Sequence, residues 1–100
     1  MVLFQHGLMD SSDGWVMNYK WQAPAFMMSN EGYDVWFNNN RGNYYSCNHT
    51  TLDPEEDAAQ FYSYDWDDLG GIDQPTVIDF ILGKTGRQNL TYIGHSMGTT

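Results

Sequence analysis

The sequence predicts an α/β fold in which parallel strands are joined by helices. Three short apolar runs, rich in β-branched and aromatic residues, each lead into glycine or asparagine, and helical patterns separate them. Uninterrupted apolar runs suit strands of a parallel sheet that is covered on both faces. Strands that alternate with helices indicate the α/β class. One hundred residues form at most one small domain.

The three predicted strands are residues 2–4, 35–37 and 90–93. The first leads to Gly7, the second to the asparagines at 38–40, and the third to Gly94. Glycine and asparagine are common turn residues, so they mark where each strand ends.

Two helices are predicted between these strands. The first begins at Pro24, a favoured first-turn residue, and runs through Met28 with Gly32 beyond its end. The second precedes the third strand and carries one apolar stripe, formed by residues 77, 78, 81 and 82. Its last turn contains Lys84, and Gly86 suits the left-handed residue that follows a helix.

The segment between these helices is acidic. Nine of the thirteen Asp and Glu residues lie between Asp53 and Asp79. Asp53, Pro54 and Glu56 have the spacing of a capped helix start, but Gly70 and Gly71 argue against a helix that continues to position 75. The acids lack the regular alternation of a calcium loop, and we expect a solvated acidic face.

No metal or cofactor is expected. The three histidines, His6, His49 and His95, have neither the i, i+4 pairing nor the cysteine spacing of a zinc site. Cys47 is the only cysteine, so it cannot form an internal disulfide, and we expect a small, partly buried residue.

The charge and hydropathy patterns exclude several classes of partner. The formal net charge is −9, which disfavours nucleic acid and anionic membrane surfaces, because both attract clustered Lys and Arg. No run approaches the roughly 18 apolar residues of a membrane span. The first seven residues do not form a secretory signal. A start inside a strand and an end inside a turn predict that residues 1–100 are a piece of a longer protein.

The final ten residues, "TYIGHSMGTT", contain the pattern Gly94-x-Ser96-x-Gly98 directly after an apolar run. A strand that leads straight into this pattern is typical of a nucleophile elbow, a tight turn that exposes a serine hydroxyl. Glycine is needed two residues before and two after the serine, because side chains there would collide with neighbouring backbone. We therefore predict that Ser96 is a catalytic nucleophile.

A serine nucleophile needs donors for the oxyanion that forms when it attacks a carbonyl. The N–H of the residue after the serine, Met97, is one predicted donor, and the other is expected from a loop after an earlier strand. Leu8, in "QHGL" after the first strand, is the predicted second donor. The two would converge if the first and third strands are neighbours, about 4.8 Å apart. His6 is expected to shape this loop, and His95 to be structural.

Four stretches, "VLFQHGLMDSSDGWVMN", "GYDVWFNNNRGN", "DQPTVIDFILGKTG" and "YIGHSMGTT", together resemble the acid lipases of the α/β-hydrolase superfamily, the gastric and lysosomal lipase and cholesteryl ester hydrolase family. The resemblance spans nearly the whole chain. It implies that residues 1–100 are the N-terminal part of an α/β-hydrolase domain, truncated just after the elbow, with the first strand between the other two. One departure is Met97, where family members commonly have glutamine, although a backbone donor survives that change.

The resemblance also implies a function. It implies hydrolysis of neutral lipid esters, triacylglycerols or sterol esters, at a lipid–water interface by a secreted or lysosomal enzyme, with a serine acyl-enzyme and no cofactor. The triad acid and histidine should follow the serine, but only four residues come after Ser96, so residues 1–100 alone are expected to be inactive. Two alternatives stay open: another α/β-hydrolase esterase or peptidase, and a non-catalytic truncated copy that binds lipid or a partner.

Several other residues carry weaker predictions. The tryptophans are expected to serve mostly as core residues rather than to line an acyl-chain tunnel; they are Trp15, Trp21, Trp36 and Trp66. Arg41, just past the second strand, is expected to form a structural ion pair rather than to orient active-site loops. Asn48 and Asn89 begin glycosylation sequons, but about one such match is expected by chance in a chain of this composition. Asn89 also directly precedes the third strand, where a glycan would need an exposed edge.

Overall fold

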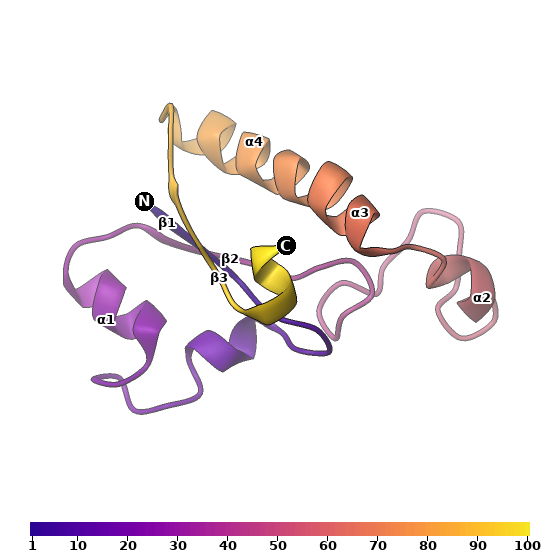
Figure 1. Ribbon diagram of the computed structural model, residues 1–100, viewed down its shortest axis with the longest axis horizontal. Helices are drawn as coiled ribbons and strands as arrows, with labels where there is room; N and C mark the ends of the chain where they lie inside the picture. The colour runs from indigo at the N-terminus through magenta and orange to yellow at the C-terminus, as the bar shows by residue number, and fades with distance from the viewer.

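The computed structural model describes residues 1–100 and contains one parallel sheet of three strands in the order β2-β1-β3 (Figure 1). The strands are β1 (Val2–Gln5), β2 (Val35–Asn38) and β3 (Thr91–Gly94). Val2 lies opposite Val35 on one side and Thr91 on the other. The α/β class, the three strands and the central position of the first strand are therefore confirmed.

The core of the molecule forms around β1, whose four residues are all buried. Val2 and Phe4 pack with Ala25, and the Trp15 ring lies 4.6 Å from that of Phe4 between centroids. Trp15 ends the 3₁₀ turn η1 (Ser12–Trp15). A central parallel strand has neighbours on both edges and both faces, which explains why its sequence is apolar without alternation.

Helix α1 (Pro24–Asn30) begins with Pro24 in its first turn and ends before Gly32, which has a φ of +88°. The predicted start is confirmed, and the helix runs two residues beyond the predicted Met28 but still ends before Gly32. Proline fits there because the first N–H groups of a helix have no partner inside it. In Figure 1 the sheet lies between α1 and α4, so the two helices cover it from different sides.

The second predicted helix is α4 (Gln74–Thr85), which buries Ile81 and has Lys84 in its last turn. Gly86 follows it with a φ of +70°, the left-handed conformation that the sequence predicts.

The predicted lack of a continuous helix from Asp53 to position 75 is confirmed, but the helix does not break at Gly70 and Gly71. A helical segment runs from α3 (Trp66–Asp68) through the π-helical turn η2 (Leu69–Asp73) directly into α4 (Figure 1). A π turn accommodates one extra residue per turn, and both glycines are exposed with no neighbour close to their missing side chains. The break lies earlier, between α2 (Ala58–Phe61) and Asp65.

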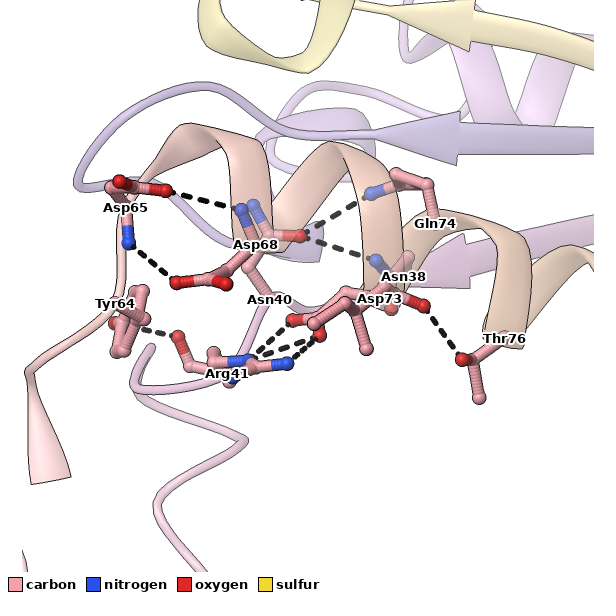
Figure 2. Close-up of polar contacts among 10 residues, drawn as sticks. Asn38, Asn40, Arg41, Tyr64, Asp65, Asp68, Asp73, Gln74 and Thr76 are labelled. Carbon is pink, nitrogen blue, oxygen red and sulfur yellow. Dashed lines mark hydrogen bonds and ion pairs between the residues drawn. The ribbon is translucent and has the colours of Figure 1, made fainter.

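A capping box starts this segment. The Asp65 carboxylate accepts the Asp68 N–H at 3.1 Å, and the Asp68 carboxylate accepts the Asp65 N–H at 3.1 Å (Figure 2). The predicted start at Asp53 forms only a turn, in which the Asp53 carboxylate accepts the N–H groups of Glu55 and Glu56 at 2.8 and 3.0 Å. These two hydrogen bonds lower the pKa of Asp53.

The acidic stretch is largely solvated, as predicted. Of its nine acids, only Asp57, Asp68 and Asp73 are half-buried, and the others are exposed. Nowhere do three or more His, Cys, Asp or Glu side chains gather closely enough to hold a metal ion. None of the helices combines the length and apolar character needed to cross a bilayer.

Candidate active site

Ser96 occupies an unusual backbone conformation at the end of β3. Its φ is +54°, in the left-handed region that disfavours residues with a side chain, and it begins the 3₁₀ turn η3 (Ser96–Thr99). The turn is closed by the Gly98 N–H, which donates to the His95 carbonyl at 2.9 Å. Met9 is the other non-glycine residue with a positive φ, at +55°. Strained conformations of this kind persist where the surrounding structure enforces them, and they cluster at functional sites.

The two glycines of the pattern have steric reasons to be there. A Cβ atom on Gly94 would run into the carbonyl group of Gly98. A Cβ atom on Gly98 would lie 2.7 Å from the carbonyl oxygens of both Gln5 and His6. The turn after β3 therefore packs directly on the end of β1, with no room for a side chain between them.

The loop after β1 lies beside the serine. A Cβ atom on Gly7 would lie 3.1 Å from the Ser96 Cβ and 3.2 Å from the His95 carbonyl oxygen. The His95 N–H donates to the Gln5 carbonyl at 3.1 Å, which extends the pairing of β1 and β3 to the turn. No strand separates the "QHGL" and "GHSMG" segments, and both follow the carboxyl ends of their strands.

A cavity of about 540 Å³ opens at this edge of the sheet, and both Leu8 and Met97 line it. Neither the Leu8 N–H nor the Met97 N–H donates a hydrogen bond within the chain. Ser96 is exposed and adjoins the cavity through its neighbours Gly7 and Met97, which belong to the lining. The remaining walls come from the loops after β1 and β2 and from residues 64–66 and 69.

His6 is tied into the loop, as the sequence predicts. Its side chain is buried, its Nδ1 lies 2.8 Å from the Gly7 carbonyl oxygen, and its Nε2 accepts the Asn40 N–H at 3.0 Å. His95 is exposed and its ring makes no hydrogen bond. The site within residues 1–100 thus has a serine and a pair of free backbone donors.

The predicted ion pair of Arg41 is confirmed, with Asp73 at the end of η2 (Figure 2). The Arg41 Nε lies 2.9 and 3.0 Å from the two carboxylate oxygens, and hydrogen bonding to Asp73 raises the pKa of the guanidinium group. The Tyr64 hydroxyl donates to the Arg41 carbonyl at 2.7 Å, and burial raises the pKa of Tyr64. These contacts hold the wall at residues 64–66 against the loop after β2.

A family model described as alpha/beta hydrolase fold matches residues 1–100. The chain belongs to the α/β-hydrolase fold family. The position of Ser96, between a strand and a helical turn at the carboxyl edge of a parallel sheet, is where this family has its nucleophile elbow.

Three curated relatives of this α/β-hydrolase chain are lipases. It is 47% identical to Lipase 1 of Drosophila melanogaster over 98 residues, 98% of this chain and 22% of that protein. Over 100 residues, all of this chain and 25% of each relative, it is 40% identical to the gastric triacylglycerol lipase of Bos taurus and 41% identical to the lysosomal acid lipase/cholesteryl ester hydrolase of Homo sapiens. The resemblance to acid lipases is confirmed, and the chain spans about a quarter of the length of these relatives.

The tryptophans of the α/β-hydrolase chain are only partly core residues, so that prediction is wrong for two of them. Trp15 packs on Phe4, and Trp36 is half-buried. Trp21 is 63% exposed, and Trp66 is 51% exposed and lines the cavity.

Sequence reasoning missed a buried cluster of amide side chains at the ends of β1 and β2, beside the candidate site. Gln5 accepts hydrogen bonds from Asn38 at 2.8 Å and from Gln74 at 2.7 Å, and donates to the Asn40 side chain at 3.0 Å. Gln5, Asn38 and Asn40 are all buried. The sequence signal that could have revealed this cluster was Gln5. It directly continues the apolar run of β1, and a strand with such a run is covered on both faces.

Proposed function

We propose that the protein is a lipase, a carboxylic ester hydrolase that acts on neutral lipid esters with Ser96 as its nucleophile. The observation that carries the proposal is the left-handed φ of +54° at Ser96, in a turn packed against Gly7. Such a conformation is costly for a serine, and it exposes the hydroxyl beside the loop that contains Leu8. The lipase names of the relatives support the same reaction.

In the proposed reaction, the Ser96 Oγ attacks the ester carbonyl carbon while its proton passes to a histidine base. The negative charge that develops on the carbonyl oxygen accepts hydrogen bonds from the Leu8 and Met97 N–H groups, which have no acceptor within the chain. The intermediate collapses, and the alcohol leaves with the proton that the histidine returns. Water then attacks the acyl-enzyme by the reverse sequence, which releases the acid and restores the serine.

The base and its acid partner are proposed to lie outside residues 1–100, which form the N-terminal part of the hydrolase domain. Both His6 ring nitrogens already have partners within the loop structure. His95 directly precedes Ser96, and consecutive side chains at a sharp turn diverge. Residues 1–100 by themselves are therefore expected to have no ester turnover.

The proposed substrates are triacylglycerols or sterol esters at a lipid–water interface. The bovine relative is a triacylglycerol lipase, and the human relative is a cholesteryl ester hydrolase. The cavity is lined by several large apolar side chains, which suits an acyl chain; they are Leu8, Met9, Tyr44, Trp66 and Met97. A net charge of −9 disfavours binding to nucleic acid. A secreted or lysosomal location agrees with the same relatives, and Asn48 and Asn89, both exposed, are proposed glycosylation sites.

Labelling of the full-length polypeptide with a fluorescent alkyl phosphonate tests the role of Ser96. The reagent should form one adduct, on Ser96, and Ser96→Ala should reduce triacylglycerol or sterol ester turnover on the order of 10⁴-fold or more. Ser29→Ala is a matched control, because Ser29 is an exposed serine on α1 whose hydroxyl makes no hydrogen bond. Folded, active protein that is labelled elsewhere, or that keeps its turnover without Ser96, would refute the proposal.

A further inference from the structure

The proposed oxyanion donor on the loop after β1 is part of a peptide group that His6 contacts. The Leu8 N–H and the Gly7 carbonyl belong to the same peptide unit. Because a peptide unit is planar and trans, its C=O and N–H bonds point in opposite directions. Whatever fixes the direction of the Gly7 carbonyl therefore also fixes the direction of the Leu8 N–H.

His6 provides the shorter of two contacts to that carbonyl. Its Nδ1 lies 2.8 Å from the Gly7 oxygen, and the side chain is only 2% exposed. The Asp10 N–H also reaches the oxygen, at a longer 3.4 Å. Glycine restricts its own backbone dihedrals less than any other residue, so the peptide after Gly7 depends on such contacts for a single orientation.

The surroundings of His6 select one tautomer of its ring. The backbone N–H of Asn40, which can only donate, points at the His6 Nε2 at 3.0 Å. The side-chain amide nitrogen of Asn43 lies 3.2 Å from the same ring atom. Nε2 must therefore accept, so in the neutral ring the proton is on Nδ1, where it can be donated to the Gly7 carbonyl.

The buried amide cluster in turn holds Asn40. The Asn40 side-chain oxygen accepts from Gln5 at 3.0 Å and from Asn38 at 3.2 Å. Gln74, at the start of α4, donates to the Gln5 side chain at 2.7 Å. It also donates to the Asn40 side-chain oxygen at 3.4 Å (Figure 2). Amides of β1, β2 and α4 thus anchor the residue whose N–H sets the tautomer of His6.

We propose that His6 is a positioning residue for ester hydrolysis: its Nδ1–H form, selected by Asn40, aims the Leu8 N–H at the developing oxyanion. This inference rests on the proposed function of Ser96 and Leu8. His6 does not touch the substrate in this proposal, and acts only through the Gly7–Leu8 peptide.

Two variants of the full-length polypeptide separate this role from a merely structural one. In His6→Asn, the amide nitrogen can take the place of Nδ1 and still donate to Gly7. In His6→Gln, the amide reaches the place of Nε2 instead, and the donor to Gly7 is lost. Loss of an oxyanion donor costs about 10²–10³-fold in kcat, so a misdirected donor should lower kcat of His6→Gln roughly 10–100-fold with little change in KM. His6→Asn should retain at least about ten times the kcat of His6→Gln.

Equal losses of kcat in the two variants, or a loss confined to KM, would overturn the proposal. Thermal unfolding of both variants shows whether the loss of kcat merely follows a loss of stability. A loss of kcat that follows stability would also count against the proposal. A measurement on the unsubstituted protein needs no variant: ¹⁵N NMR of the His6 ring should show a protonated Nδ1 and an unprotonated Nε2. The opposite tautomer would refute the proposal. If the proposed function itself were wrong, the result would be different, because the phosphonate would not label Ser96 at all.

Discussion

Replacing Gly98 with alanine tests whether close packing of the serine turn on β1 determines the site. The new Cβ would lie 2.7 Å from two backbone oxygens, those of Gln5 and His6, and such atoms essentially never come within 3.0 Å. The turn and the strand must therefore separate by at least about 0.3 Å, although a 3.1 Å hydrogen bond from His95 to Gln5 holds them together. Overpacking of this kind costs about 1–3 kcal/mol, which is the loss of stability we expect.

Urea unfolding of the full-length polypeptide measures this loss, as a lower midpoint at an unchanged m-value. Gly83→Ala is the matched control, because Gly83 lies inside α4 with nothing within 4 Å of a new Cβ. Alanine favours a helix by about 0.5–1 kcal/mol over glycine, so this variant should be more stable than the unsubstituted protein. The phosphonate should also label Ser96 more slowly in Gly98→Ala. A Gly98→Ala protein with undiminished stability would show that the steric reasoning is wrong.

Two further predictions concern other contacts of the fold. Asp65→Ala removes the cap on the Asp68 N–H and should cost about 1 kcal/mol in urea unfolding. Asp67→Ala removes only an exposed charge from the first turn and should cost less. Tyr92→Phe removes the 2.7 Å hydrogen bond to the Gly98 carbonyl and should also cost about 1 kcal/mol. Because burial raises the pKa of Tyr92 in the folded state, this contribution is complete below the ordinary tyrosine pKa and is lost as the pH rises through the raised value. A stability difference between the two proteins that stays constant in alkaline solution would contradict this assignment.

The elements that the sequence predicted correctly depend on local patterns. The strand at β1 follows from an uninterrupted apolar run, and the boundaries of α1 and α4 follow from Pro24 and Gly86, whose backbone preferences hold in any surroundings. The turn at Ser96 was likewise recognisable, because its glycines reflect contacts with neighbouring backbone. The position of β1 between the other strands came from the resemblance to acid lipases.

The features that sequence reasoning missed depend on packing between distant segments. Gly70 and Gly71 predicted a break, but the capping box at Asp65 and the ion pair of Asp73 with Arg41 hold one helical segment in place around them. The Asp-x-x-Asp spacing at Asp65 was a usable local signal. The wall at residues 64–66 was not predictable in this way, because a contact with the distant loop after β2 holds it at the site.

The order of the strands also affects how the chain folds during its synthesis. β1 is the middle strand, yet its partner β3 follows it at Thr91, long after Val2 in the chain. At ordinary rates of translation, roughly 4–18 s pass between the synthesis of these two segments. During that interval one edge of the apolar strand β1 has no partner, and an unpaired edge is where nascent chains associate wrongly. The amount of polypeptide in which the serine turn can form therefore depends on keeping this edge of β1 away from other chains until β3 has been made.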